Sequence, residues 1–268
     1  MAYKIGDVAR ILGISTDLIR YYEEKGVVKP HKDKFNNYRY YDAWDVNFLL
    51  DCVWFKKIGF GIDEIAKMTT NESYDDFVCH LSRHSDEIAT SIEHQQLLLE
   101  RIDSHIESVK RITEYMGVCD VRTNKEFIYY LNRFNSEYDN SEELQRLNKE
   151  WEKYNPFTKR FFLIEKHALE GECEDYAFGL SANMQYVEKF NISSSSPVKR
   201  TKQHLCLHSA FKSYGKNAFT ARHLDFMVKF AKENNYKIVG PAFGNLVCSL
   251  PANEEHVGYF EAWIPIER

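Results

Sequence analysis

The stretch YKIGDVARILGISTDLIRYYEEKGVVKP, residues 3–30, decides the fold of the first part of this chain. Apolar residues recur at helical spacing from Ile5 to Leu12, and the pattern stops at Gly13. Ser15 then stands in the N-cap position of a second short helix. Two short helices joined by a turn at a glycine are typical of a helix-turn-helix.

Planar and cationic side chains gather in the second of these helices and in the strand pair expected to follow it. The helix carries Arg20, Tyr21 and Tyr22 in a row, and the strands carry YRYY at residues 38–41. Such groups on one surface supply the contacts that a DNA backbone requires. The formal net charge of the chain is −5, but residues 25–39 hold five Lys or Arg against one Asp. The basic surface is therefore local, which favours DNA binding over the alternative of a helical domain that binds none.

The whole N-terminal stretch resembles the winged-helix domain of the MerR family of bacterial transcription regulators. The resemblance covers residues 3–70 and rests on the IGxxA start, the RYYE helix, the GxxKP exit, the YRYY wing and the FKKxGFxxxEI helix. It implies a winged-helix DNA-binding domain over residues 1–75, with double-stranded promoter DNA and RNA polymerase at the promoter as partners. The side chains expected to face DNA are Arg20 and Tyr21 in the major groove, Tyr22, Tyr38, Arg39, Lys56 and Lys57 at phosphates, and Ser15, which is a helix cap first.

Two positions depart from the family pattern. Asp17 places an acid near the start of the recognition helix, where phosphate repels it unless it accepts a hydrogen bond from a cytosine amino group. Asn37 replaces the usual wing glycine, which is tolerable because Asn enters the left-handed backbone region readily. The first departure leaves the operator sequence open, and the second leaves the fold unchanged.

A long helix is expected from Val78 to Met116, a stretch that contains neither Gly nor Pro. Apolar residues occupy most of its heptad seam, and Gln95 near the centre would fix the register. Because a helix of roughly 58 Å cannot hide such a stripe on a chain of this size, a second copy is the expected partner. A helix packed on its own chain is the alternative. The MerR resemblance implies that residues 76–117 form an antiparallel coiled coil in a homodimer, whose two recognition helices read a pseudo-palindrome.

Beyond Gly117 the pattern changes to short aromatic and β-branched runs. The first set reads as a strand at 126–134, a helix at 141–154 and strands at 160–169 and 175–186. The same order returns as a strand at 204–214, a helix at 219–235 and strands at 245–251 and 258–266. The sequence therefore predicts a duplicated βαββ domain over residues 118–268, an α+β chain, and a groove for a small ligand between the halves.

The second set resembles the GyrI-like effector domain, which BmrR-like multidrug-sensing regulators join to a MerR reader. The resemblance rests on LCLHSAFKSYG, ENNYKIVGPAFG and FEAWIPI. It implies a small-molecule inducer and makes Glu261 the buried carboxylate of the pocket, with Tyr259 and Trp263 on the same strand face. A cationic or aromatic molecule would relieve the cost of an unpaired buried carboxylate. Tyr130 and Tyr176 are further expected pocket walls, and a solvated Glu261 at the rim is the alternative.

The MerR resemblance also implies a mechanism. The dimer stays on a promoter whose two recognition elements are spaced too far apart for polymerase, and ligand binding bends and untwists the DNA between them. Deforming such a site costs about 1–6 kcal/mol, which the binding of one small molecule can supply.

Other classes of protein find little support in the sequence. No apolar run reaches the ~20 residues of a membrane span, and the N-terminus lacks a signal-peptide core, so a cytoplasmic protein is expected. The six cysteines are scattered without a CxxC pair, as buried thiols would be. With no nucleophile elbow, phosphate loop or HExxH motif, we expect no catalytic residue, no cofactor and no metal site.

Two further functions stay open as alternatives. Cys79 and Cys119 stand near the positions where metal-sensing MerR relatives carry ligands, with His80 and His84 beside the first, although no second Cys follows at ligand spacing. A GyrI-like hydrolase would use a Glu and a Trp of the pocket, residue types that the closing strand supplies. A general base also needs a raised pKa and a placed water, which a sequence does not show.

Overall fold

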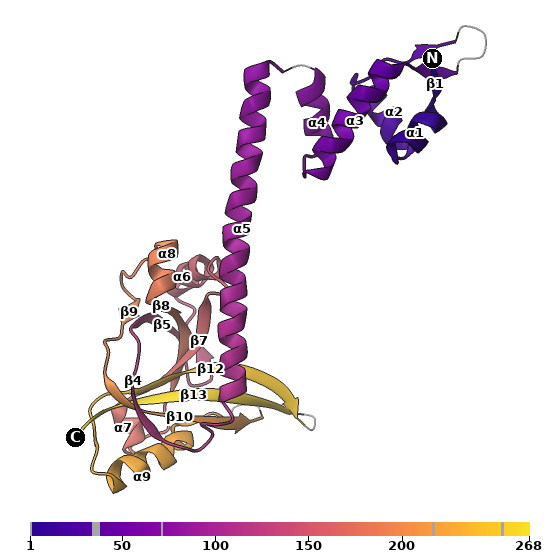
Figure 1. The fold of residues 1–268 in the computed structure, drawn as a ribbon. Coiled ribbons are helices and arrows are strands. Elements are labelled where there is room, and N and C mark those ends of the chain that lie inside the picture. The colour runs from indigo at the N-terminus through magenta and orange to yellow at the C-terminus, as the bar shows by residue number, and fades with distance from the viewer. Residues whose placement is uncertain (1, 34–37, 71, 216–217, 253–254) are drawn as a thin grey trace. The chain divides into compact units, whose positions relative to one another are not determined.

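A computed structural model describes residues 2–33, 38–70, 72–215, 218–252 and 255–268 (Figure 1). The chain divides into two compact units, Met1–Gln95 and Gln96–Arg268, and one long helix, α5 (Tyr74–Arg111), passes from the first to the second. The boundary between the units lies inside this helix, and the three-part division expected from the sequence stays a prediction.

The N-terminal unit begins with the helix-turn-helix that the sequence predicts. α1 (Ile5–Leu12) ends at Gly13, whose φ of 66° is a left-handed conformation that glycine adopts without strain. α2 (Thr16–Glu24) follows Ser15, whose hydroxyl accepts a hydrogen bond from the backbone N–H of Leu18 at 3.1 Å. The predicted role of Ser15 as a helix cap is confirmed.

A small antiparallel sheet accompanies these helices. Its strands lie in the order β1 (Tyr3–Lys4), β3 (Arg39–Tyr41) and β2 (His31–Lys32). The last two are the strand pair predicted for the wing, and Asn37 lies outside the described residues between them.

The remaining helices of this unit close its core. α3 (Ala43–Lys57) begins with a reciprocal cap, because Asp42 and Asp45 each accept from the other's backbone N–H, at 2.9 and 3.0 Å. α4 (Ile62–Thr70) follows it. The side chains buried between the helices and β3 include Val8, Ile19, Tyr22, Tyr41, Leu49 and Ile65.

The helix α5 is 38 residues long, about 57 Å at 1.5 Å per residue. It ends five residues before the predicted Met116, because Ile112 turns inward and is buried and Met116 forms a bridge with Ala210 of the sheet. The last five residues of the predicted helix, 112–116, are therefore not helical.

The C-terminal unit is built on a sheet of ten described strands. Its first half contributes β4 (Asp120–Thr123), β5 (Phe127–Phe134), β6 (Glu137–Tyr138), β7 (Thr158–Ile164), β8 (Ala177–Asn183) and β9 (Lys199–Arg200). Its second half contributes β10 (Leu205–Tyr214), β11 (Lys237–Ile238), β12 (Ala242–Ala252) and β13 (Glu255–Glu267). The central strands lie in the order β10-β13-β12-β7-β8-β5, and the antiparallel pair β12 and β7 is at the middle. Read inward from either end, the order gives the first, the third and the second strand of the predicted set to which those strands belong.

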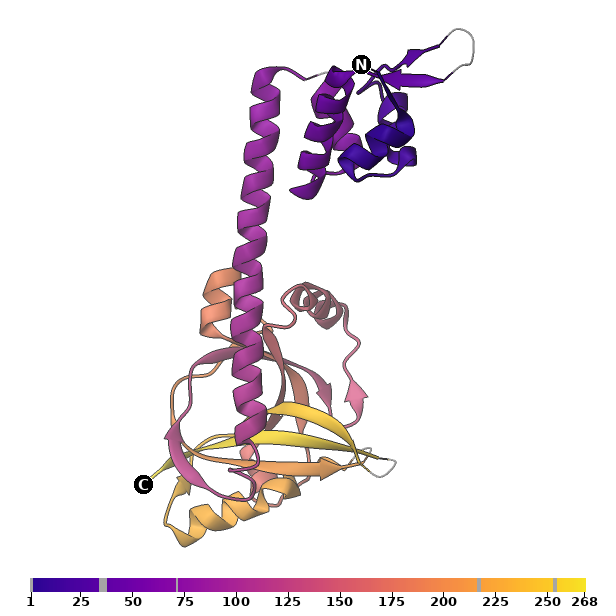
Figure 2. The same ribbon diagram turned by 45° about the vertical axis from the view of Figure 1, so that its right-hand side comes forward.

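Helices cover this sheet at several places. The segments α7 (Lys166–Leu169), η1 (Ala221–Leu224) and α9 (Asp225–Glu233) share a core with Phe162, Leu207, Phe260 and Ile264. α6 (Glu142–Glu152) and α8 (Met184–Phe190) contribute to a second core with Ile128, Tyr130 and Ala182. In both views α9 lies below β10 and β13, and the last turns of α5 lie above them (Figures 1 and 2).

Two predicted strands are shorter than expected. Residues 166–169 and 184–186, at the ends of these predicted strands, are helical rather than extended and belong to α7 and α8. In each case the chain leaves the sheet at one extended residue, Glu165 or Asn183, which precedes the helix as its N-cap. No helix in the described parts of the chain is both long and apolar enough to span a membrane.

Candidate DNA-binding surface and ligand cavity

Three of the predicted DNA contacts line one hollow on the N-terminal unit. Arg20 comes from α2, while Tyr38 and Arg39 come from the beginning of β3. Lys4 also lines this hollow, and its ammonium lies 5.7 Å from the centre of the Tyr38 ring. The second helix and the wing therefore present cationic groups and an aromatic ring to the same surface.

Both arginines of this hollow already have acidic partners. Arg20 donates from Nη1 to Oδ1 of Asp17 at 2.8 Å, and Arg39 donates from Nε to the carboxylate of Glu23 at 2.6 and 2.9 Å. Asp17, the unusual acid of the recognition helix, thus holds the guanidinium of Arg20 one turn away. The Nη nitrogens of Arg39 make no hydrogen bond to any described residue.

Tyr21 is turned toward α4. Its hydroxyl donates to Asp63, and the ammonium of Lys25 lies 2.7 Å from the same carboxylate and 5.2 Å from the Tyr21 ring. The hydrogen bond to Asp63 raises the pKa of Tyr21 above its ordinary value. A major-groove contact by Tyr21 stays a prediction, and it would require this side chain to share its hydroxyl between Asp63 and a base.

The position of Tyr22 differs from the one that the sequence predicts. Its side chain is 0% exposed, and its hydroxyl has no hydrogen-bond partner among the described residues. Burial raises its pKa to about 12. A phosphate contact by Tyr22 is therefore wrong, and the residue belongs to the core. Its spacing of three from Ile19, which is also fully buried, is the signal that could have placed it there.

The other predicted phosphate contacts are exposed. Lys56 and Lys57 lie in the last turn of α3, and neither forms an ion pair with a described residue. Ser15 is exposed as well, although its hydroxyl is occupied by the cap to Leu18. Phosphate binding by these three residues stays a prediction.

Glu261 has the strand environment that the sequence predicts. Along β13, Tyr259, Glu261 and Trp263 are half-buried, whereas the alternating Phe260 and Ala262 are buried. The carboxylate is not unpaired, however, because Nε2 of His208 lies 2.8 Å from Oε1 of Glu261. The sequence analysis missed this partner, although His208 lies within the LCLHSAFKSYG segment and faces Trp263 across the β10–β13 pair.

His208 bridges two carboxylates. Its imidazole is 1% exposed, its Nδ1 lies 3.0 Å from Oδ1 of Asp120, and its Nε2 meets Glu261. The rings of Tyr115 and Trp263 flank it at 4.9 and 4.3 Å between centroids. Trp263 therefore packs on this imidazole, which places it beside the carboxylate of Glu261.

Glu261 also lines a cavity of about 810 Å³ in the C-terminal unit. The cavity is lined by the last turns of α5, by α6 and by strands β7, β8, β12 and β13. This volume lies within the range of roughly 300–1,000 Å³ that is usual for small-molecule sites. A second hollow of about 400 Å³, near Tyr115 and Arg122, shares Glu261 as a wall.

The remaining predicted pocket residues lie elsewhere. Tyr130 is 1% exposed, and its hydroxyl donates to Oδ1 of Asn148 at 2.7 Å, so it stands behind the cavity wall. Tyr176 packs on Phe178 and lines a different hollow. Tyr259 packs under the ammonium of Lys212 at 5.1 Å. Tyr130 and Tyr176 as walls around Glu261 are therefore wrong, because their side chains belong to other parts of the sheet.

The charged groups around the cavity are mostly cationic. They comprise Arg101 and the imidazole of His105 from α5, Lys149, Lys159 and Arg160, against the carboxylates of Glu152 and Glu261. Burial lowers the pKa of Lys159 below its ordinary value, and Glu261 opposes this in part. Partial burial, Arg101 and Lys159 together lower the pKa of His105.

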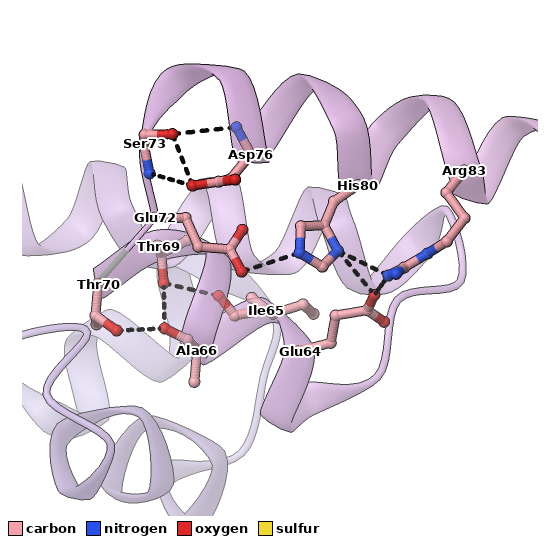
Figure 3. A network of polar contacts seen from close by, with 10 residues as sticks. All are labelled: Glu64, Ile65, Ala66, Thr69, Thr70, Glu72, Ser73, Asp76, His80 and Arg83. Carbon is pink, nitrogen blue, oxygen red and sulfur yellow. Dashed lines mark hydrogen bonds and ion pairs between the residues drawn. The ribbon is translucent and has the colours of Figure 1, made fainter.

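The residues considered for a metal site have other partners. His80 lies 2.9 Å from Glu72 through Nε2 and 3.5 Å from Glu64 through Nδ1, and Arg83 also reaches Glu64 at 3.0 Å (Figure 3). Cys79 is exposed, and Cys119 is half-buried. Within the described residues no three His, Cys, Asp or Glu side chains are grouped as metal ligands. Figure 3 shows that this polar network joins α4 to the beginning of α5, where Ser73 and Asp76 form the cap.

A helix-turn-helix followed by a strand pair, with arginine and tyrosine side chains around one hollow, has the form of a winged-helix domain. Residues 3–72 match the model of the MerR HTH family regulatory protein. This segment of the chain is thus a MerR-type helix-turn-helix domain.

Known relatives share mainly this segment. The transcriptional activator TipA of Streptomyces coelicolor is 23% identical over 108 residues, which cover 40% of this chain and 42% of TipA. The transcriptional regulator CueR of Escherichia coli is 38% identical over 64 residues, which cover 24% of this chain and 47% of CueR. The chain thus spans less than half the length of each of these relatives. A cryo-EM structure of an EcmrR–DNA complex is 16% identical, covers 99% of this chain and 100% of that one, and has a TM-score of 0.38, too low to establish a shared arrangement.

Proposed function

We propose that this protein is a MerR-type transcription regulator that binds promoter DNA as a homodimer and responds to a small molecule. The observation that carries the proposal is the MerR family match over residues 3–72, together with the hollow in which Arg20, Tyr38 and Arg39 meet. Cationic and aromatic groups from a recognition helix and a wing are suited to one duplex surface.

The homodimer is supported by the heptad seam of α5. Its apolar side chains from Ile88 to Val109 are between 38% and 60% exposed, and they include Ile92, Leu99, Ile102 and Ile106. A stripe of this length exposed to water is unfavourable, and a second α5 offers the complementary apolar face. We therefore place the dimer interface along this seam, antiparallel as in the family.

The sensor function is assigned to the cavity beside Glu261. Arg101 and His105 of α5 line it, so a bound molecule contacts the same helix that carries the seam. The mirrored strand order of the sheet supports a GyrI-like domain of two βαββ sets. Ligand binding would shift α5, and through the dimer it would distort the DNA between the two half-sites, at a cost of about 1–6 kcal/mol.

The experiment that tests this function uses the full chain. Selection from a random double-stranded DNA library should enrich a pseudo-palindrome, and transcription from a promoter carrying it, with RNA polymerase added, should change with an effector. Enrichment of sequences without two-fold symmetry, or of none, would reject the regulator.

The proposed regulator uses no catalytic residue and no cofactor. Oε1 of Glu261 is engaged by His208, an arrangement that holds the carboxylate in place. No specific observation favours the hydrolase alternative over the sensor.

A further inference from the structure

The cavity beside Glu261 presents an excess of positive charge. Arg101, Lys149, Lys159 and Arg160 line it with four basic side chains, against the two carboxylates of Glu152 and Glu261. None of the four cations forms an ion pair within 4.0 Å in the described parts of the chain. Arg101 uses Nε to donate to the carbonyl oxygen of Pro156 at 3.0 Å, which fixes its guanidinium at the rim.

Two asparagines of the cavity present their amide donors to it. Oδ1 of Asn148 accepts from the hydroxyl of Tyr130 at 2.7 Å and from Nδ2 of Asn132 at 2.8 Å. Oδ1 of Asn245 accepts from the hydroxyl of Ser181 at 3.1 Å. Both amide oxygens are thus used within the wall. The two NH₂ groups make no hydrogen bond to a described residue and remain for a ligand.

The cavity also holds acceptors, among them the carboxylate of Glu152 and the amide oxygen of Gln145, whose Nε2 donates to the carbonyl oxygen of Asn140 at 2.8 Å. Oε1 of Glu261 is occupied by His208, which leaves one oxygen of that carboxylate for a cation. Trp151 lines the cavity, and its indole Nε1–H has no hydrogen-bond partner among the described residues. Leu180, Leu246 and Val247 supply an apolar wall next to these polar groups.

From this arrangement we propose that the cavity binds a small organic anion, a carboxylate or phosphate joined to an apolar body. The anionic group lies among Arg101, His105 and Lys159 and accepts from the amides of Asn148 and Asn245. The apolar body packs on Trp151 and Leu180. This proposal rests on the proposed sensor function and replaces the cationic inducer expected from the sequence, because a cation would meet four like charges.

Three matched probes test the sign of the ligand charge. Calorimetric titration of the full chain compares 2-naphthoate, 2-naphthylmethanol and 2-naphthylmethylammonium, which share one ring system and differ in charge. We expect 2-naphthoate to bind most tightly. Inorganic phosphate is the fourth probe, and we expect it to bind more weakly than 2-naphthoate because it lacks an apolar body.

Three variants test the position of the site. Lys159→Gln should weaken 2-naphthoate binding at least about tenfold, equivalent to about 1.4 kcal/mol, while the exposed control Lys229→Gln should bind it as the parent does. Glu261→Gln should raise 2-naphthoate affinity, since it removes a like charge. Thermal unfolding of each variant verifies that it is folded.

Several results would overturn the anion site. These are tighter binding of 2-naphthylmethylammonium than of 2-naphthoate, equal 2-naphthoate affinity in Lys159→Gln, or binding of none of the four probes. The sensor function has its own readout in the promoter assay. If 2-naphthoate binds as expected but leaves transcription unchanged, the anion site stands and the sensor function fails; if a cation alone binds and changes transcription, the reverse holds.

Discussion

Nε2 of His208 on β10 lies 2.8 Å from Oε1 of Glu261 on the neighbouring strand β13, and its Nδ1 lies 3.0 Å from Asp120 on β4. One buried imidazole thus ties three strands together. The backbone carbonyl of Tyr115, just beyond α5, accepts from the hydroxyl of Ser209 at 3.2 Å. The attachment of the long helix to the sheet and the carboxylate of the cavity therefore share one polar cluster.

Replacing His208 should destabilise the C-terminal unit. His208→Ala leaves two carboxylates facing a gap without a shared donor, and we expect the free energy of unfolding to fall by about 1–3 kcal/mol. Denaturant unfolding measures this, with His256→Ala as the control, because His256 is an exposed residue of the neighbouring strand β13. Equal stability of the two variants would show that the bridge contributes little.

Tyr22 gives a test that separates core packing from DNA contact. Because its buried hydroxyl has no partner among the described residues, Tyr22→Phe should keep or raise stability, by up to about 1 kcal/mol, and should keep operator affinity. Tyr41→Phe is the matched variant, since Tyr41 is equally buried and its hydroxyl is in the same situation. A DNA-binding defect of Tyr22→Phe at unchanged stability would restore the phosphate contact.

The sequence predicted what depends on local spacing. The helix-turn-helix, the Ser15 cap and the alternation around Glu261 all follow from periodicity within one element. The burial of Tyr22 and the contact between His208 and Glu261 depend on which other elements pack against α2 and β13. The spacing of residues within one element does not give this information. The charge of the cavity has the same origin, because Arg101 and Lys159 are 58 residues apart in the chain and meet only when α5 ends on the sheet.

The heptad seam gives a prediction about assembly. Leu99→Asp and Ile102→Asp each place a charge on an exposed seam position and should convert the dimer to a monomer in analytical ultracentrifugation. Glu100→Ala, on the same helix outside the seam, is the control. Because each half-site alone binds weakly, the monomeric variants should also lose operator affinity. A dimer that persists in both variants would move the interface away from α5.

Arg39 should contribute equally to the affinity for any DNA sequence. Arg39→Ala removes one cation from the phosphate backbone, so affinity should fall alike for operator and random DNA. The slope of log affinity against log salt should flatten by about 0.9 for each phosphate that Arg39 neutralises. Arg146→Ala, an exposed arginine of α6, is the control. A defect confined to the operator would instead assign Arg39 to base recognition.

His105 contributes one part of the pH dependence of stability. Partial burial, Arg101 and Lys159 lower its pKa below the ordinary value of 6.5, so the unfolded chain binds more protons than the folded one between the two pKa values. The contribution of His105 to stability is therefore complete above 6.5 and is lost as the pH falls through that window. His105→Gln should remove this part of the pH dependence in thermal unfolding.

Anion binding should raise the pKa of His105 again, because the anion opposes the electrostatic effect of the nearby cations. The groups that face His105 in the cavity are the cations Arg101, Lys149, Lys159 and Arg160 and the carboxylates Glu152 and Glu261. An anion among these cations favours the protonated imidazole, so binding takes up a fraction of a proton and affinity rises as the pH falls. Titration with 2-naphthoate between about pH 5.5 and pH 8, in buffers of different ionisation enthalpy, measures this uptake. Proton release on binding, or the same uptake in His105→Gln, would show that this imidazole does not face the anion.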